Sequence, residues 1–408
     1  MAEHITSQQA MDLEEKHGAH NYHPLPVVLA KGKGAKVWDA EGKEYYDFLS
    51  AYSAVNQGHC HPKIIGAMKE QAETLTLTSR AFFNNVLGVY EKYITEYFGY
   101  DKVLPMNSGA EADETALKLA RKWAYLEKGV PENEAKIVVA NDNFHGRTIT
   151  IISMSTDPDS YKGYGPYTPG FINVRYNNID ELSKVLEEDP NIAAFLVEPI
   201  QGEAGVFVPN DGYLKKAHEL CKQHNVLFIA DEVQTGLART GKLLACDHEG
   251  VRPDVVILGK ALSGGAMPVS AVLADDEVML TIKPGEHGST FGGNPLAAKV
   301  AMAALEVIKE ENLSDRASYL GEIFRDELGK IESDMIHIIR GKGLLNAIVI
   351  KPKNGNTAWD VCVEMSKNGV LAKPTHGDII RFAPPLVITE EELRDALQRI
   401  KKAILSFE

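Results

Sequence analysis

Cysteine is scarce in this chain, and the residues that could bind a metal are poorly spaced. Four cysteines are scattered over 408 residues without paired spacing. This pattern is typical of free thiols in a reducing compartment and argues against a disulfide framework. The only compact His/Cys group, residues 59–61, consists of adjacent side chains and lacks the ligand spacing of a structural zinc site. We therefore expect neither disulfides nor a metal centre.

Long apolar runs and positive charge are also in short supply. No stretch approaches the ~18 consecutive apolar residues of a membrane-spanning helix, and residues 1–15 show neither a secretory nor a transit pattern. Lysine and arginine number 43 against 57 acidic residues, a formal net charge of -14. That balance argues against nucleic acid or an anionic membrane as a partner. It leaves small anions open, since a few local arginines bind them. We expect a cytoplasmic protein.

From residue 84 onward, short apolar strands alternate with expected helices. Continuous β-branched runs such as 136–140 and 192–197 are typical of strands buried on both faces of a parallel sheet. The alternation predicts an α/β protein with a mainly parallel central sheet covered by helices. After residue 295 the order changes to two long helices followed by short strands and helices. We therefore predict a large domain at 59–295 and a smaller α+β domain formed by 296–408 with 1–58.

Two apolar runs end in charged residues. Residues 226–230 are followed by Asp231, and residues 255–259 by Lys260. Because the carboxyl ends of parallel strands lie at one edge of a sheet, we expect this acid and this amine to lie close together. Pyridoxal phosphate (PLP) requires a carboxylate that keeps its ring nitrogen protonated and a lysine that binds its aldehyde. Taken singly, Asp231 also suits a helix N-cap and Lys260 a solvent-exposed strand end.

Small residues open the helix that follows the expected strand at 102–106. Gly109 and Ala110 stand where backbone N–H groups and the helix dipole create a site for an anion such as phosphate. Ser289 and Thr290 begin a second cluster of hydroxyl groups and glycines at 289–294. Each signal is weak alone, because serine and glycine before a helix also serve as ordinary caps.

Three further loops contain candidate binding residues. Phe144 suits stacking on a ring, and the planar fork of Arg147 suits a carboxylate, although both also fit a plain surface loop. Glu203 lies in a glycine-containing loop that is equally typical of solvated surface. Arg381 lies in an apolar stretch, where a guanidinium needs an acidic partner, and a structural ion pair would satisfy it.

Together these motifs indicate a family. The blocks 195–205, 230–241 and 254–265 resemble the class III (subgroup II) aminotransferases, PLP enzymes of fold type I, and the resemblance spans nearly the whole chain. Residues 18–26, 51–62 and 197–205 are similar to the members that act on the δ-amine of ornithine. The resemblance implies transfer of that amine to 2-oxoglutarate, a place in proline formation and arginine breakdown, and glutamate 5-semialdehyde as the product, which cyclises to pyrroline-5-carboxylate.

The resemblance also implies roles for individual residues. Lys260 would bind PLP and move the proton, and Asp231 would pair with the pyridine nitrogen. The other cofactor contacts would be Gln234 at the phenolic oxygen, Val233 and Phe144 on the two ring faces, and Gly109 and Ala110 at the phosphate. Thr290 would reach the phosphate held by a neighbouring subunit, which implies a homodimer with shared active sites.

Substrate contacts are implied for a second set: Tyr22, Tyr52, Arg147, Glu203, Ser289 and Arg381. Tyr22 and Arg147 would hold the α-amino and α-carboxylate ends of ornithine. Glu203 would cover Arg381 while ornithine reacts and release it to bind the α-carboxylate of 2-oxoglutarate.

Three alternatives to this function stay open. Another ω-aminotransferase of the same class would act on N-acetylornithine, 4-aminobutyrate or lysine. A non-catalytic binding protein could retain the fold, although the presence of both Lys260 and Asp231 argues against it. A PLP aminomutase or decarboxylase would not require 2-oxoglutarate.

Overall fold

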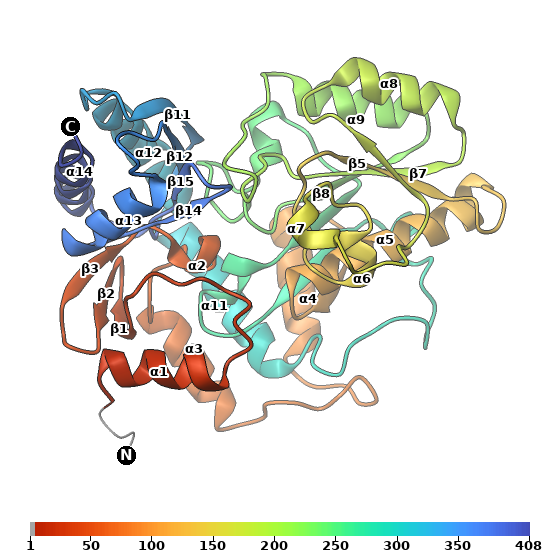
Figure 1. Ribbon diagram of the computed structural model, residues 1–408. Coiled ribbons are helices and arrows are strands. Elements are labelled where there is room, and N and C mark those ends of the chain that lie inside the picture. Colours follow the sequence, from red (N-terminus) through yellow and green to blue (C-terminus); the bar gives the residue numbers. More distant parts are fainter. Residues whose placement is uncertain (1–4) are drawn as a thin grey trace.

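The computed structural model describes residues 5–408, and a seven-stranded sheet lies at its centre (Figure 1). The strand order is β4 (Lys102–Met106), β10 (Ser270–Ala274), β9 (Val255–Leu258), β8 (Leu227–Asp231), β7 (Ile192–Val197), β5 (Lys136–Ala140) and β6 (Phe171–Val174). Only β10 runs antiparallel to its neighbours in this sheet. The predicted α/β fold with a mainly parallel sheet is confirmed.

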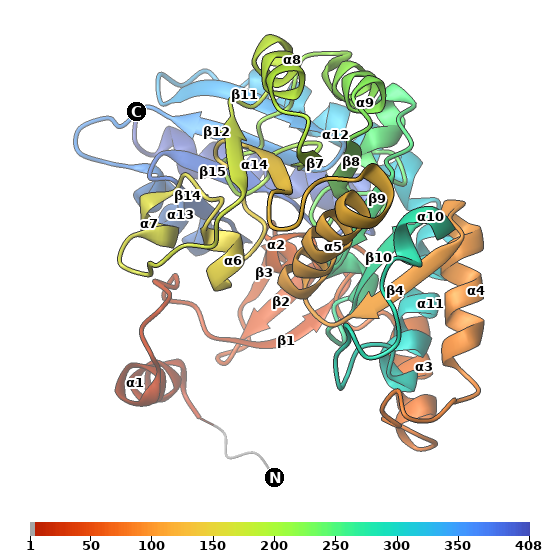
Figure 2. The same ribbon diagram turned by 90° about the vertical axis from the view of Figure 1, so that its right-hand side faces the viewer.

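Helices cover both faces of this sheet. Successive residues of β5 point to opposite sides, because Ile137 packs with α5 (Gly109–Trp123) and Val138 packs with α8 (Ile179–Glu188) and α9 (Tyr213–Gln223). Figure 2 shows α4 (Leu87–Phe98) and α11 (Pro295–Glu310) beside β4 and β10. Burial on both faces explains why these strands are continuous apolar runs.

Two smaller sheets lie on one side of the molecule, in red and blue in Figure 1. One has the order β1 (Leu29–Lys33), β2 (Lys36–Asp39), β3 (Glu44–Asp47) and β13 (Val370–Leu371). The other has the order β11 (Ile336–Lys342), β12 (Leu345–Ile350), β15 (Ile379–Phe382) and β14 (Lys373–Thr375). The sequence suggested a strand pair near Val370 and Ile379. Instead, β13 runs parallel to β3, and β14 pairs with β15.

The remaining helices are mostly where the sequence placed them. They are α1 (Ser7–His17), α3 (Pro62–Ala72), α12 (Leu313–Gly329), α13 (Ala358–Lys367) and α14 (Glu390–Leu405), with short turns α6 (Ile149–Ile152), α7 (Pro158–Tyr161) and α10 (Asp276–Met279). Thr389 and Glu392 form a capping box at the start of α14. Across residues 5–408, every helix is too short or too polar to cross a bilayer.

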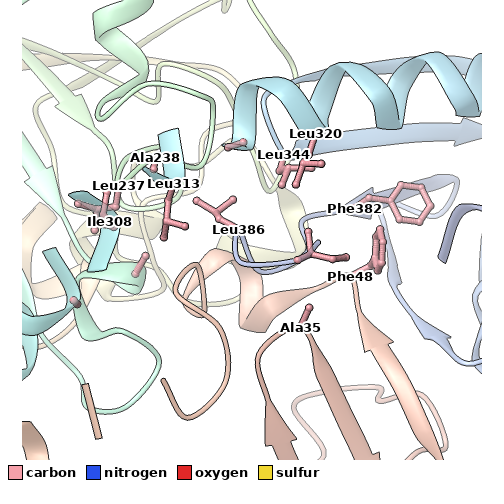
Figure 3. Close-up of a cluster of buried hydrophobic side chains, with 14 of the residues drawn as sticks. Ala35, Phe48, Leu237, Ala238, Ile308, Leu313, Leu320, Leu344, Phe382 and Leu386 are labelled. Carbon is pink, nitrogen blue, oxygen red and sulfur yellow. The ribbon is translucent and has the colours of Figure 1, made fainter. Parts of the chain in front are cut away.

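One hydrophobic cluster joins the N-terminal and C-terminal parts of the chain (Figure 3). The rings of Phe48 and Phe382 meet edge to face, with centroids 6.1 Å apart. Leu313, Leu344 and Leu386 belong to the same cluster and are 0% exposed. Burial of each such side chain contributes about 1.5–3 kcal/mol, so this cluster holds the two chain ends together.

The short helix α2 (Ser50–Ser53) is left-handed. Its four residues all have positive φ, from 46° to 73°, and none is glycine. A left-handed turn costs roughly 1–2 kcal/mol per residue for L-amino acids. Strain of this kind persists only where surrounding packing fixes it, and it is concentrated at functional sites.

Candidate active site

The acid and the amine at the two strand ends lie at the same sheet edge. Asp231 is the last residue of β8, and its partner in the parallel strand β9 is Ile257, three residues before Lys260. Asp231 is 4% exposed, and its Oδ1 accepts the N–H of Val233 at 3.0 Å. Lys260 opens a 3₁₀ turn, Lys260–Ser263, with a φ of 41°. This backbone turn directs the lysine into a cavity instead of along the strand.

That cavity encloses about 620 Å³ of empty space, part of which is open to solvent. Its lining includes eight of the predicted site residues: Gly109, Ala110, Phe144, Glu203, Asp231, Val233, Gln234 and Lys260. The lining also contains Asp113, His145 and Glu198, which are not among the predicted site residues. The predicted cofactor residues, apart from Thr290, are therefore brought together around one space.

The first turn of α5 offers unpaired backbone donors to this cavity. Ser108 and Glu111 form a capping box, so the serine hydroxyl is already engaged. The N–H groups of Gly109 and Ala110 donate to no acceptor within residues 5–408. A Cβ on Gly109 would lie 3.1 Å from Cγ1 of Val233, and one on Gly259 would lie 3.2 Å from the same atom. Glycine at both positions lets three segments close around the valine.

Burial and charge prepare Lys260 as a nucleophile. Burial lowers the pKa of its amine, and the nearby guanidinium of Arg381 acts in the same direction. The carboxylates of Asp231 and Glu203 oppose this shift. The net result is a lowered pKa, which increases the fraction of free amine near neutral pH.

Asp231 has a partner that the sequence analysis did not identify. Nδ1 of His145 lies 2.7 Å from Oδ2 of Asp231, and the histidine side chain is fully buried. Burial lowers the pKa of His145, but the hydrogen bond and charge of Asp231 outweigh burial and raise the pKa overall. Burial also raises the pKa of Glu198 to about 7, with the charge of Asp231 adding to the shift. The sequence signal that could have identified both residues is their position after a strand, since Glu198 follows β7 directly and His145 follows β5 closely.

Arg381 and Glu203 form an ion pair beside the cavity. Nη1 of Arg381 lies 2.7 Å from Oε2 of Glu203, and Arg381 is 5% exposed. The guanidinium also sits over the ring of Tyr52, 5.3 Å from its centroid. Tyr52 belongs to the left-handed turn α2, so the strained segment supports this pair. The Nε atom of Arg381 has no partner among the described residues.

The other predicted substrate residues lie outside the cavity lining. Tyr22 is 71% exposed, and Arg147 is exposed, bonded to Ser160 at 3.2 Å. Ser289 accepts a hydrogen bond from Asn107 at 2.7 Å, whereas its neighbour Thr290 is exposed. The structure of one chain thus does not bring these four predicted residues into the cavity.

The two histidines of the His/Cys run at 59–61 form hydrogen bonds with carboxylates. His59 pairs with Asp47 at 2.7 Å and His61 with Glu311 at 2.8 Å, while Cys60 is exposed.

The aminotransferase class-III family profile matches residues 17–404, nearly the whole described chain. The chain is a class-III aminotransferase. It is 64% identical to the ornithine aminotransferase, mitochondrial, of Drosophila melanogaster, covering 96% of this chain and 90% of that protein. It is 63% identical to the enzyme of the same name from Rattus norvegicus, covering 98% and 91%.

Solved structures agree with the family. An ornithine aminotransferase from Toxoplasma gondii ME49 superposes with a TM-score of 0.97 at 53% identity, covering 98% of this chain and 96% of that one. A protein named acetylornithine aminotransferase, from Elizabethkingia anophelis, gives 0.91 at 62% identity, covering 99% and 100%. These neighbours confirm the predicted fold and the relation to PLP transaminases.

One expectation from the sequence is wrong. The Drosophila and rat relatives are named mitochondrial, which overturns the cytoplasmic location expected from the polar N-terminus. Amino-acid composition does not distinguish the two compartments, because mitochondrial and cytoplasmic enzymes both fold in an aqueous medium.

The cavity of this aminotransferase fits PLP. An acid and a lysine lie on its lining, and the free N–H groups of Gly109 and Ala110 suit a phosphate. The buried Oε1 atom of Gln234 has no partner among the described residues, which leaves this amide available to a ligand. The geometry therefore agrees with a PLP cofactor, on which the family depends.

Proposed function

We propose that this class-III aminotransferase moves the δ-amino group of ornithine to 2-oxoglutarate. The observation that carries the proposal is the ion pair of the half-buried Glu203 and the buried Arg381 near Lys260. A site that must accept one carboxylate in the first substrate and two in the second needs an arginine that can be covered. The names of the fly and rat relatives support the same substrate.

Chain residues provide binding and proton transfer. When bound, PLP supplies an electron sink that stabilises negative charge on the substrate carbon next to the transferred amine. Asp231 would hold the ring nitrogen of the cofactor protonated, and Val233 and Phe144 would pack against its ring. The amine of Lys260 would take the proton from the substrate carbon and hold it on Nζ until it is returned during the same half-reaction, as a base with a lowered pKa can.

Substrate selection depends on Glu203 and Arg381. With ornithine in the site, Glu203 neutralises Arg381, while Arg147 binds the only carboxylate and Tyr22 the α-amine. When 2-oxoglutarate enters, Arg381 leaves Glu203 and binds the α-carboxylate, while Arg147 takes the distal one. Tyr52 and Ser289 shape the pocket wall. The amine then leaves as glutamate, and the semialdehyde product cyclises, as expected for a step between arginine breakdown and proline formation.

The proposed active form is a homodimer. Three phenylalanine side chains are exposed to solvent: Phe82 is 74%, Phe83 105% and Phe291 51% exposed. Exposed apolar side chains of this size are unfavourable in an isolated chain and are typical of an interface. Thr290 adjoins Phe291 and is exposed, so it can reach the phosphate held by a second copy. We place a large domain at 59–295 and a small domain at 296–408 with 1–58, consistent with the pairing of β3 and β13.

A second candidate substrate is N-acetylornithine, favoured by the name of the 62% identical Elizabethkingia structure. The two substrates differ only at the α-amine, which acetylation makes neutral and larger. Tyr22 is the residue proposed to face that group.

A steady-state assay decides between them. With 2-oxoglutarate as acceptor, we expect kcat/KM for ornithine to exceed that for N-acetylornithine, with pyrroline-5-carboxylate as the detected product. A higher value for N-acetylornithine would overturn the proposed substrate, and activity without 2-oxoglutarate would overturn transamination.

A further inference from the structure

A third carboxyl group, that of Asp113, lies next to the pair of Asp231 and His145. Asp113 is on α5, one helical turn after Gly109, and is 1% exposed. Its Oδ1 atom has no hydrogen-bond partner within residues 5–408. That atom lies 3.6 Å from Nδ1 of His145, and the same nitrogen lies 2.7 Å from Asp231. One imidazole nitrogen therefore faces two carboxyl groups but is bonded to one.

The surroundings of Asp113 are too acidic for another buried anion. Asp231 and Glu198 face it from the ends of β8 and β7, and Glu114 adds negative charge from α5 itself. Lys260 is the opposing charge across the cavity. Burial, followed by the charges of these acids, raises the pKa of Asp113 well above its usual value. This shift favours the protonated, uncharged form of the carboxyl group.

The unequal distances at His145 agree with an uncharged Asp113. An ionised Asp113 would compete with Asp231 for the imidazole proton, whereas a neutral acid attracts that proton weakly. We infer that Asp113 is a positioning residue that, while uncharged, leaves the His145 N–H to Asp231 and so keeps the Asp231 carboxylate aligned at the cofactor end of the cavity. This inference rests on the cofactor site of the proposed function, but not on ornithine as the substrate.

Two substitutions of Asp113 separate positioning from space filling. Asp113→Asn keeps the shape and stays neutral at every pH, so we expect the dissociation constant for PLP to stay within about twofold of wild type. Asp113→Ala removes the carboxyl group that lies 3.6 Å from Nδ1 of His145, so the ring gains room to turn away from Asp231, and we expect PLP binding to weaken by about tenfold. We expect the pH midpoint of the cofactor's visible absorbance to be displaced in the Ala variant and unchanged in the Asn variant.

Thr115→Val is the matched control. Thr115 is also on α5 and 0% exposed, but its hydroxyl bonds to Glu111 and His287 and not to the cavity. The control loses a buried hydrogen bond, so thermal stability should fall while PLP affinity and the absorbance midpoint stay unchanged. An equal fall in PLP affinity in this variant and in Asp113→Ala would mean that Asp113 acts only through helix stability.

The direct measurement is infrared spectroscopy of the wild-type holoenzyme against Asp113→Asn. We expect a carbonyl band of a protonated carboxylic acid in wild type that the Asn variant lacks. Absence of that band, or a displaced midpoint in the Asn variant, would show that Asp113 is charged and overturn the inference. The infrared comparison still decides if the Ala variant fails to fold. Wild-type protein that binds no PLP would instead overturn the proposed function.

Discussion

Among single residues, Glu203 carries the first prediction. Glu203→Ala uncovers Arg381, so α-amino acids with two carboxylates gain a binding partner in the first half-reaction. We expect kcat/KM for glutamate relative to ornithine to rise by about tenfold, which corresponds to about 1.4 kcal/mol. Rapid mixing of the holoenzyme with glutamate or with ornithine, followed by the visible absorbance of the cofactor, measures the two kcat/KM values and so their ratio.

A glutamate outside the site is the control for that experiment. Glu327→Ala removes an exposed ion pair with Lys330 on α12 and should leave the ratio unchanged. An unchanged ratio in the Glu203 variant itself would show that this residue does not cover Arg381.

Glu232 carries the second prediction, on stability. It is 1% exposed, accepts the N–H of Cys246 at 2.9 Å, and burial raises its pKa from 4.5 to about 7. The folded chain therefore holds a proton that the unfolded chain has lost above pH 4.5. The resulting stability is fully present below pH 4.5 and is lost as the pH rises through 7.

Glu232→Gln removes this titration while it keeps the shape. Relative to wild type, we expect the variant to gain on the order of 1–3 kcal/mol in free energy of unfolding between pH 4.5 and pH 8. Urea denaturation at both pH values measures the gain. Glu187→Gln, at an exposed position on α8, should show no such gain. A constant difference across the range for Glu232→Gln would mean that Glu232 is ionised in the folded chain.

At the scale of elements, the left-handed turn α2 gives the third prediction. Ala51 is exposed with φ 46° and ψ 49°, a conformation in which glycine avoids the Cβ strain. Ala51→Gly should stabilise the protein by about 0.5–1 kcal/mol, because relief of strain exceeds the added entropy of the unfolded chain. Ala67→Gly, inside the right-handed helix α3, should destabilise it by about 1 kcal/mol. Thermal unfolding of both variants tests this, and destabilisation by Ala51→Gly would show that the turn is unstrained.

The same elements show what the sequence could predict. Strands buried on both faces, such as β5 and β7, were predicted to the residue because their apolar runs end sharply. The turn at Ser50–Ser53 was not, because it contains no glycine and its conformation depends on tertiary packing. Likewise, β13 has only two residues, so its partner in β3 follows from the position of the whole C-terminal part.

Within the site, the sequence predicted the residues whose role can be inferred from adjacent residues of the chain. It missed the residues whose role depends on contacts with distant parts of the chain. Asp231 and Lys260 end apolar runs, so their position was readable. His145 does not end an apolar run. Its role depends on its position 2.7 Å from Asp231, a residue 86 positions away in the sequence. For Asp113, only the four-residue spacing from Gly109 pointed to a shared helix face.

For the molecule as a whole, the proposed homodimer with shared active sites predicts complementation between variants. In a mixed dimer of Lys260→Ala and Thr290→Ala chains, one site has lost both residues and the other has lost neither. Equal mixing and random reassociation makes half of the dimers mixed, and each mixed dimer has one intact site, so the mixed dimers alone should restore about a quarter of wild-type activity. Activity that stays at the average of the two parents would mean that Thr290 acts within its own chain.

The pairing of β3 with β13 joins residue 47 to residue 371. A ribosome adds about 5–20 residues per second, so the edge of β3 waits on the order of tens of seconds for its partner strand. During that interval the edge is open to pairing with other chains. The N-terminal sheet can therefore be completed only near the end of translation, and a chain truncated before residue 370 would leave it permanently unfinished.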